Sequence, residues 1–317
     1  MLQTAFLGLG AIGAPMARNL AARPDVSVAL WNRTAAKARA LAAAVPNADG
    51  RVRVASSPAD AARGAELVLT CLPTSREVEQ LLDGSSGAGE GMLAGLAAGS
   101  ILVDCTSGDP ATSRRIAARL AERGIGFVDA PVSGGVIGAE QAKLTVMCGG
   151  DAATVERARP ALSAFGAKIV HCGPVGAGHA LKSVNNALLA VHVWSTAEGL
   201  AALERAGVRA DVALDVINAS SGRSNTSMTL FPERVLTRTF PRTFRLALLD
   251  KDVGIAAGVA RDHGVPSPLL QLTAELFRVA HAALGEEADH VEAAKVVEQW
   301  AGVEIGGARS GAGGRER

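Results

Sequence analysis

The chain has 317 residues, of which 48% are hydrophobic and 20% are charged, and its formal net charge is +1 at pH 7. This composition is typical of a globular protein long enough for two domains, and it excludes a disordered chain. The near-neutral charge excludes long-range electrostatic recruitment of nucleic acid or of an acidic membrane surface.

The first half of the chain alternates short apolar segments with alanine- and arginine-rich segments. Strands are predicted at residues 3–7, 26–31, 52–55, 67–72, 100–104, 125–129, 144–148 and 168–171. Helices are predicted near residues 12–22, 34–44, 75–82, 110–123 and 152–164. Such alternation predicts a doubly wound parallel sheet of the Rossmann type. The glycine-rich loop before residues 144–148 allows an antiparallel pairing there.

The pattern changes at the Gly/Pro segment 173–178, which indicates a domain boundary. From about residue 179 to 303 the periodicity is helical only. The segment 179–206 is apolar nearly all round, so we expect it to be buried on every side, in a helical core or against a partner subunit. The sequence thus predicts a Rossmann domain over residues 1–172, an all-α substrate and oligomerisation domain over 173–303, and a disordered tail over 304–317.

The first predicted strand leads into a glycine-rich turn. It reads Gly8-Leu9-Gly10-Ala11-Ile12-Gly13 and precedes a helical segment. In a βαβ unit the first glycine permits a tight turn, the second lets the backbone approach a pyrophosphate, and the third lets the helix pack on the strand. The helix N-terminus offers N–H groups and a positive dipole end to phosphates. We therefore predict that these six residues bind a dinucleotide cofactor.

The second strand ends in Asn32-Arg33-Thr34, where NAD sites usually carry an acid that binds the ribose 2′-hydroxyl. Arg33 can pair with a 2′-phosphate and Thr34 can donate a hydroxyl, which favours NADP(H) over NAD(H). The alternative is a solvated Arg33 that stacks on the adenine of either cofactor. Ligands also bind at the carboxyl ends of neighbouring strands, so four more residues are candidates for cofactor binding: Leu72, Pro73, Thr106 and Ser107.

Four blocks in order give the chain a family resemblance. They are the glycine fingerprint followed by Pro15-Met16-Ala17-Arg18-Asn19-Leu20; Asp129-Ala130-Pro131-Val132-Ser133-Gly134-Gly135 with Gly138-Ala139; Gly176-Ala177-Gly178 with Lys182 and Asn185-Asn186; and Lys251-Asp252. With these blocks, residues 3–303 resemble the 3-hydroxyisobutyrate dehydrogenase family of β-hydroxyacid dehydrogenases. The resemblance implies an NAD(P)-dependent oxidoreductase that interconverts a small 3-hydroxy acid and its semialdehyde or oxo acid.

Two of these blocks also indicate their own chemistry. Ser133-Gly134-Gly135 can turn several backbone N–H groups into an anion-binding nest for a substrate carboxylate. Lys182 lies near the start of the long apolar helix, where burial would lower its pKa toward the value that a general acid/base needs. Asn186 lies one turn further on the same face, where it would orient Lys182 or the substrate oxygen. The family resemblance implies the same role for Lys182.

Other residues are assigned mainly by the resemblance. It implies that Lys251 and Ser107 contact the cofactor, whereas Lys251 taken alone resembles a solvated lysine between two acids. Arg223, in Ser220-Ser221-Gly222-Arg223-Ser224, would either contact a second polar group of the substrate or hold its loop. The chain departs from the family pattern at Ala142, where glycine is usual, which puts the path of that loop in doubt.

Several absences narrow the function further. The chain has no tyrosine, which rules out a tyrosine-based short-chain dehydrogenase mechanism. Its six histidines and four cysteines form no metal-binding spacing, so no metal is expected and the thiols should be free. No signal peptide or membrane span is predicted, which leads us to expect a cytoplasmic enzyme, a homodimer or homotetramer, that binds neither nucleic acid nor membranes. The alternatives are imine reduction, for which relatives usually carry another residue at position 182, and a non-catalytic NADP-binding scaffold.

Overall fold

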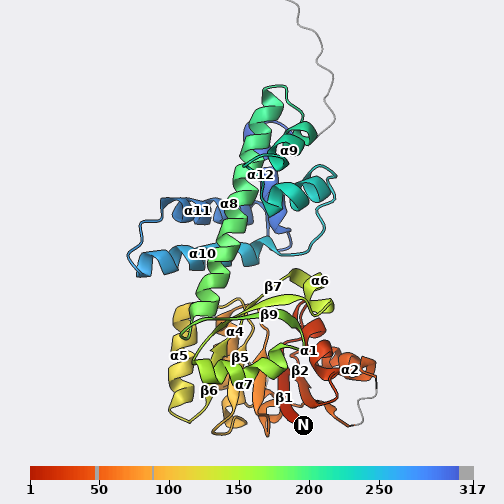
Figure 1. Cartoon of the computed structure of the whole chain (residues 1–317), viewed down its shortest axis with the longest axis vertical. Helices are drawn as coiled ribbons and strands as arrows, with labels where there is room; N and C mark the ends of the chain where they lie inside the picture. The colour runs from red at the N-terminus through yellow and green to blue at the C-terminus, as the bar shows by residue number, and fades with distance from the viewer. Residues whose placement is uncertain (47–49, 88, 307–317) are drawn as a thin grey trace, which may run out of the picture. The chain divides into compact units, whose positions relative to one another are not determined.

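The computed structural model describes residues 1–46, 50–87 and 89–306. The chain divides into two compact units, Met1–Ser183 and Val184–Arg317. The division falls inside the long helix α8 (Ala177–Arg205), which is continuous in Figure 1, and not at the Gly/Pro segment where the sequence changes character. The first turns of α8 therefore count with the first unit, because they make their contacts there.

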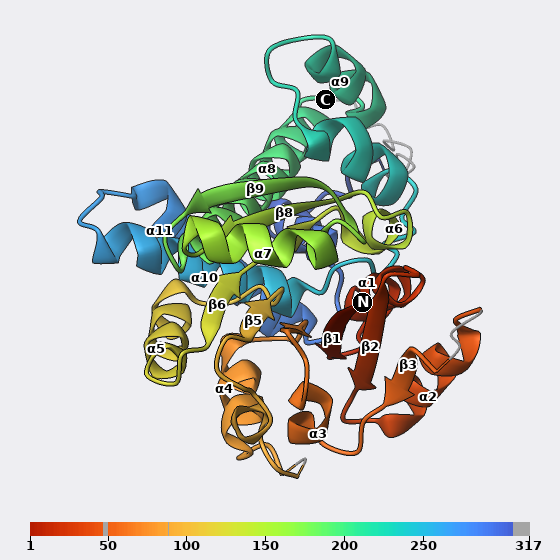
Figure 2. The same ribbon diagram turned by 60° about the horizontal axis from the view of Figure 1, so that its bottom comes forward.

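The first unit contains the doubly wound sheet predicted from the alternating pattern. Its described strands are β1 (Leu2–Leu7), β2 (Val26–Trp31), β3 (Val52–Val54), β4 (Leu67–Thr70), β5 (Ile101–Asp104), β6 (Gly126–Asp129), β7 (Val132–Ser133), β8 (Leu144–Gly149) and β9 (Gly166–Gly173). The order is β3-β2-β1-β4-β5-β6-β8-β7, and β9 pairs with β8, which it follows side by side in Figure 2. The antiparallel pairing allowed for residues 144–148 is confirmed, because β8 runs antiparallel to β6 and β7.

Helices cover both faces of this sheet. Alternate residues of β1 point to opposite faces, so Phe6 packs in one apolar cluster and Leu7 in another. The first cluster includes residues of α1 (Gly13–Ala21), α2 (Ala35–Ala44), α6 (Gly135–Glu140) and α7 (Ala152–Leu162). The second includes residues of α3 (Pro58–Ala62), α4 (Ser75–Asp83), η1 (Met92–Ala94) and α5 (Pro110–Ala121). The short elements α3, α6 and β7 were not predicted, because they carry too few residues for a periodic pattern.

The register of the parallel strands brings their carboxyl ends to one edge of the sheet. Leu7 pairs with Trp31 on one side and with Thr70 on the other. Thr70 in turn pairs with Asp104, and Asp104 pairs with Asp129. Segments far apart in the sequence therefore begin their loops at the same level, which is where ligands bind in open α/β sheets.

The elements of the second unit are helices, as predicted. They are the remainder of α8, α9 (Ala210–Asn218), the π-helix η2 (Thr226–Val235), α10 (Leu246–Asp262), α11 (Pro268–Leu284), η3 (His290–Glu292) and α12 (Ala293–Ala301). In both views α10 and α11 run side by side (Figures 1 and 2). The core of this unit centres on Trp194, whose ring lies 6.0 Å from Phe277 and 5.6 Å from Trp300, measured between ring centroids. These aromatic contacts link α8 to α11 and α12.

The structure bears on two expectations about the second half. Leu181 is 46% exposed and Leu188 is 51% exposed, so the single chain does not cover the long helix on every side, and burial against a partner subunit stays a prediction. The expectation of a disordered tail from residue 304 is wrong at Ile305, which is fully buried and whose N–H donates to Glu298 Oε1 at 2.9 Å. Residues 307–317 of that expected tail lie outside the described residues. No helix in the described ranges has the length and apolar content needed to cross a membrane.

Asp289 holds the segment that leads into α10. Its fully buried carboxylate accepts hydrogen bonds from the backbone N–H groups of Thr243 and Phe244, at 2.8 and 3.0 Å. It also lies 3.1 Å from His290 Nδ1 and 3.5 Å from Arg234 Nη1. Burial by itself raises the pKa of this carboxyl, but the hydrogen bonds from His290 and the backbone outweigh it and hold the pKa well below its usual range. Ionised Asp289 therefore stabilises the fold.

We expect Asp289→Asn to lower the free energy of unfolding at pH 7 by about 3–5 kcal/mol, since it breaks a buried charged network. Because the folded pKa is lowered, this contribution is complete above the unfolded pKa of about 3.9 and is lost as the pH falls toward the folded value. In urea unfolding, the difference between wild type and variant should shrink between pH 7 and pH 3. The control is Asp25→Asn, in an exposed pair with Arg23, and an equal loss in both variants would contradict the assignment.

Candidate active site

The glycine-rich turn after β1 leaves no room for other residues at two positions. Gly8 has a φ of +101°, and a Cβ there would lie 2.3 Å from the carbonyl oxygen of Cys71. A Cβ on Gly13 would lie 2.0 Å from the carbonyl oxygen of Gly8. The first and third glycines therefore let β1, β4 and α1 approach one another, as the fingerprint predicts.

The second glycine has a different reason to be small. A Cβ on Gly10 would meet no protein atom within 4 Å, so its backbone faces open space. Gly10 and Ala11 are exposed, Ile12 at the start of α1 makes no side-chain cap, and no acid lies in the first turn of α1. The N–H groups at this helix terminus can therefore meet an anion. These residues fit the pyrophosphate of a dinucleotide.

Asn32 ties the end of β2 to this turn. Its Oδ1 accepts a hydrogen bond from the N–H of Leu9 at 2.9 Å, and its Nδ2 donates to the carbonyl oxygen of Thr34 at 3.1 Å. Arg33 and Thr34 are exposed beside it. Of the three predicted residues, Asn32 forms hydrogen bonds that fix the loop, whereas Arg33 and Thr34 face solvent, where they can contact a cofactor. Leu9 itself is buried.

The loops after β4 and β5 are joined through Thr106. Its buried hydroxyl accepts a hydrogen bond from the N–H of Leu72 at 3.1 Å, and its own N–H donates to Asp104 Oδ1 at 3.1 Å. Thr106 therefore holds the two loops together from below. Pro73 is exposed and Ser107 is half-buried, so these two lie closer to the surface of the same edge.

The predicted anion nest follows β7. Gly134 and Gly135 have φ values of +134° and +64°, a backbone conformation that favours glycine, and Ser133 is half-buried before them. A Cβ on Gly135 would meet nothing within 4 Å, so the turn is open. Ala142, where the family usually has glycine, keeps the left-handed backbone of a glycine with a φ of +56°. The loop therefore keeps that path at a cost of about 1 kcal/mol of strain.

Lys182 lies in the second turn of α8 and is half-buried, less than the sequence led us to expect. The start of this helix is held by Asp129, at the end of β6. The carboxylate of Asp129 accepts hydrogen bonds from the N–H groups of Gly176 at 2.7 Å and His179 at 2.9 Å. Sequence reasoning missed this role, although an acid that ends a buried strand signals a special partner.

In the second unit, Asp252 joins two of the predicted site residues. Its carboxylate is 1% exposed, accepts a hydrogen bond from Asn186 Nδ2 at 2.6 Å, and lies 3.1 Å from Lys251 Nζ. Lys251 is therefore an ion-paired, largely buried lysine in the second turn of α10, and not a solvated one. A buried carboxylate between an amide and an ammonium fixes the orientation of both.

Arg223 is exposed on the loop between α9 and η2. That loop is closed by reciprocal hydrogen bonds between Ser224 and Ser227: each backbone N–H donates to the other hydroxyl, at 2.8 and 3.1 Å. These bonds do not involve Arg223, so both roles predicted for Arg223 stay predictions.

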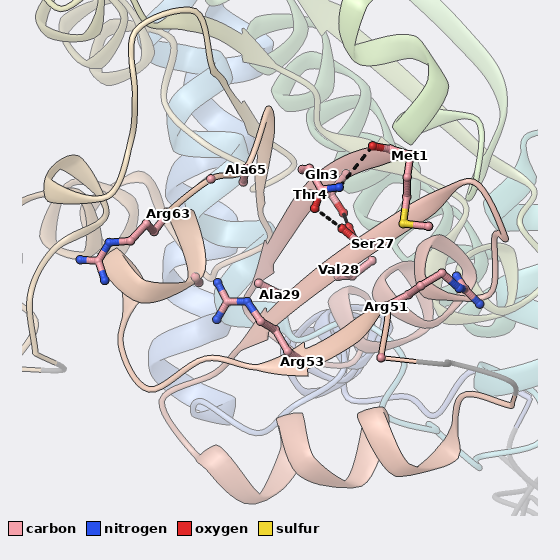
Figure 3. A pocket seen from close by; sticks show the side chains of 13 residues that line it. Met1, Gln3, Thr4, Ser27, Val28, Ala29, Arg51, Arg53, Arg63 and Ala65 are labelled. Atoms are coloured by element: carbon pink, nitrogen blue, oxygen red, sulfur yellow. Dashed lines mark hydrogen bonds between the residues drawn. The ribbon is translucent and has the colours of Figure 1, made fainter.

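One pocket lies away from this edge of the sheet. This pocket of about 400 Å³ lies at the amino ends of β1 and β2 and contains no predicted site residue. In Figure 3 its residues Arg51 and Arg63 lie on opposite sides of Gln3 and point away from it.

The four cysteines are free, as expected, and burial raises the pKa of Cys148 to about 12. Within the described residues, no group of three or more His, Cys, Asp or Glu could hold a metal.

Comparisons with known proteins cover both halves of the chain. Residues 3–173 match the NAD-binding domain of 6-phosphogluconate dehydrogenase, and residues 176–297 match the NAD-binding domain of NADP-dependent 3-hydroxyisobutyrate dehydrogenase. The chain is 34% identical to 2-(hydroxymethyl)glutarate dehydrogenase of Eubacterium barkeri, over 96% of this chain and 98% of that protein. It is 37% identical to NAD-dependent L-serine dehydrogenase of Pseudomonas aeruginosa, over 88% and 92%. A 3-hydroxyisobutyrate dehydrogenase of Mycobacterium tuberculosis, solved with L-serine, matches with a TM-score of 0.82 and 32% identity, over 94% and 99%.

The different surroundings of Gly10 and Gly13 give a paired prediction. Gly10→Ala adds a methyl group that meets no protein atom, so it should fold normally yet lose at least tenfold in affinity for the nicotinamide dinucleotide. Gly13→Ala collides with the backbone of Gly8 and should lower the melting temperature as well. Cofactor titration and thermal unfolding of both variants test this. Unchanged cofactor affinity in Gly10→Ala would show that the dinucleotide does not approach this turn.

Proposed function

The chain belongs to the 3-hydroxyisobutyrate dehydrogenase family of nicotinamide-dependent oxidoreductases that act on the CH–OH group of hydroxy acids, and on this premise we propose that it interconverts a small 3-hydroxy acid and its semialdehyde or oxo acid, with Lys182 as the proton-transfer residue. The compounds in the relatives' names support this substrate class. 3-Hydroxyisobutyrate, L-serine and 2-(hydroxymethyl)glutarate each carry a hydroxymethyl group on the carbon next to a carboxylate.

The observation that carries the proposal is the open turn at Ser133-Gly134-Gly135. A substrate carboxylate would accept hydrogen bonds from the N–H groups of Gly134 and Gly135 and from the hydroxyl of Ser133. Held at its acid group, a 3-hydroxy acid has its reacting carbon two bonds beyond the carboxylate carbon, which restricts where the hydroxyl oxygen can lie. When bound, the nicotinamide supplies or accepts the hydride at that carbon.

Lys182 would move the proton. In reduction its ammonium group donates a proton to the carbonyl oxygen as the hydride reaches the carbon, and in oxidation its amine accepts the hydroxyl proton. The position of Lys182 on a helix whose start is hydrogen-bonded to the sheet supports this role. Asn186, one turn further along α8, would orient the reacting groups, and its hydrogen bond to Asp252 keeps its amide in one rotamer.

Three further residues complete the proposal. Lys251, ion-paired to Asp252, would contact the cofactor. The exposed Arg223 would meet a second polar group of the substrate, in keeping with the second carboxylate in the name of one relative. The exposed Arg33, with no carboxylate on either side of it, supports NADP(H) as the preferred cofactor.

We also propose that the chain assembles as a homodimer or homotetramer. The exposed apolar side chains on two helices of the second unit support this. They are Val212 and Val216 on α9, and Leu269, Leu272 and Val279 on α11. Apolar residues gathered on one face of a helix are typical of subunit interfaces.

We expect Lys182→Ala to lower kcat about 10²–10⁴-fold with 3-hydroxyisobutyrate, L-serine or 2-(hydroxymethyl)glutarate as substrate, because proton transfer is lost. Affinity for NADP(H) should remain within twofold. The control is Lys168→Ala, an exposed lysine on β9. Full activity in Lys182→Ala would exclude the lysine as the proton-transfer residue, and no turnover by the wild type with any hydroxy acid would favour the scaffold alternative.

Cofactor preference is tested at Arg33. Arg33→Ala should raise KM for NADPH about tenfold or more, because a charge-assisted bond to the 2′-phosphate is worth about 1.5–3 kcal/mol. KM for NADH should change little. Arg39→Ala removes another exposed arginine, from α2, and serves as the matched control. An equal effect on both cofactors would mean that Arg33 stacks on adenine and does not distinguish them.

A further inference from the structure

The backbone N–H groups at the start of α8 find their hydrogen-bond acceptor in an unusual place. The first N–H groups of a helix have no partner within it, and in the first unit α3, α4, α5 and α7 each receive a cap from a nearby Ser, Thr or Asp side chain. For α8 the acceptor comes from a distant strand. Asp129, the last residue of β6, accepts from Gly176 and His179, which lie 47 and 50 residues away in sequence.

The surroundings of Asp129 are shaped to admit its carboxylate. A Cβ on Gly149 would lie 2.5 Å from Asp129 Oδ1, and a Cβ on Gly178 would lie 2.9 Å from Oδ2 and 2.2 Å from the carbonyl oxygen of Met147. The carboxylate is fully buried. A buried charge satisfied by backbone N–H groups at a helix N-terminus holds that terminus to one place.

A second contact holds the same turn from the side. The imidazole of His179 is fully buried, and its Nδ1 lies 2.7 Å from the hydroxyl oxygen of Ser113 on α5. The ring lies against Gly108, where a Cβ would come within 2.7 Å of His179 Cε1. His179 thereby links α8 to the loop that contains Ser107, one of the predicted cofactor residues.

We propose that Asp129, together with the Ser113–His179 pair, is a positioning residue for proton transfer: it fixes the first turn of α8 and, through that turn, the place of Lys182. This inference rests on the proposed role of Lys182. Lys182 follows His179 by three residues, less than one helical turn. A tilt at the start of the helix is passed directly to the lysine, and a misplacement of about 1 Å can cost roughly 10²-fold in rate.

The inference predicts which kinetic constant changes. The glycine turn at residues 8–13 is held by contacts such as the hydrogen bond from the N–H of Leu9 to Asn32, which involve neither Asp129 nor Ser113, so we expect the main effect on kcat and not on cofactor affinity. Asp129→Asn keeps the shape but points an N–H₂ group at an N–H donor. It should lower kcat about 10²-fold. Ser113→Ala should lower kcat about three- to tenfold, the effect of one lost hydrogen bond. The dissociation constant for the cofactor should stay within twofold in both.

A double-mutant cycle separates positioning from general stability. If Asp129 and Ser113 act through Lys182, neither substitution should lower kcat further in the Lys182→Ala background. The matched control is Asp151→Asn, which removes the carboxylate cap of α7, bonded to the N–H of Thr154 at 3.0 Å. This variant loses a helix cap in the same unit but should keep wild-type kcat.

The outcomes distinguish this inference from the proposed function. If Lys182→Ala keeps full activity, the proposed function itself is wrong. If Lys182→Ala is inactive but Asp129→Asn keeps its kcat, only the positioning role is overturned. The role is also overturned if Asp151→Asn loses as much kcat, or if the effects persist without Lys182. Should Asp129→Asn fail to fold, Ser113→Ala and its double variant with Lys182→Ala decide by the same criteria.

Discussion

A buried carboxylate must be met by hydrogen-bond donors, and the first unit depends on how the carboxylate of Asp129 is met. Its two acceptor oxygens meet the free N–H groups of the first turn of α8, so the end of a strand and the start of a helix satisfy each other. A Cβ on Gly149 would collide with this carboxylate, and a Cβ on Gly178 would collide with the carbonyl oxygen of Met147 and also crowd the carboxylate. The placement of the Asp129 carboxylate thus accounts for Gly149 and for where the longest helix begins.

Close approach of backbone segments also shapes the edge of the sheet where the cofactor is proposed to bind. Parallel register brings the ends of β1, β2, β4 and β5 to one level, and glycines let the turns between them approach closely. Asn32 and Thr106 then connect neighbouring loops by side-chain to backbone hydrogen bonds. The loops that are proposed to hold the cofactor are therefore braced by polar side chains below them, while Gly10, Arg33 and Thr34 face outward.

The second unit uses a buried acid in a comparable way. Asp252 holds an amide from α8 and the ammonium group of Lys251 on its own helix, α10, and Asp289 holds the segment that leads into α10. Each carboxylate is satisfied by several donors, so removing a single donor leaves a buried charge partly unpaired. The predicted site residues of this unit thus have their orientation set by acids that are not themselves assigned to substrate or cofactor.

The sequence alone determined what depends on local pattern: the alternating strands and helices, the glycine turn after the first strand and the long helix of the second half. It could not show that Asp129 caps α8 or that Asp252 joins Asn186 to Lys251, because those partners lie about 50 and 66 residues apart. Nor could it show that Leu188 is exposed or that Ala142 adopts a left-handed backbone. A periodic sequence pattern indicates the local secondary structure and which side of it is apolar. Only folding decides which distant groups satisfy a buried charge, and for that reason the tertiary structure decided how the site is held.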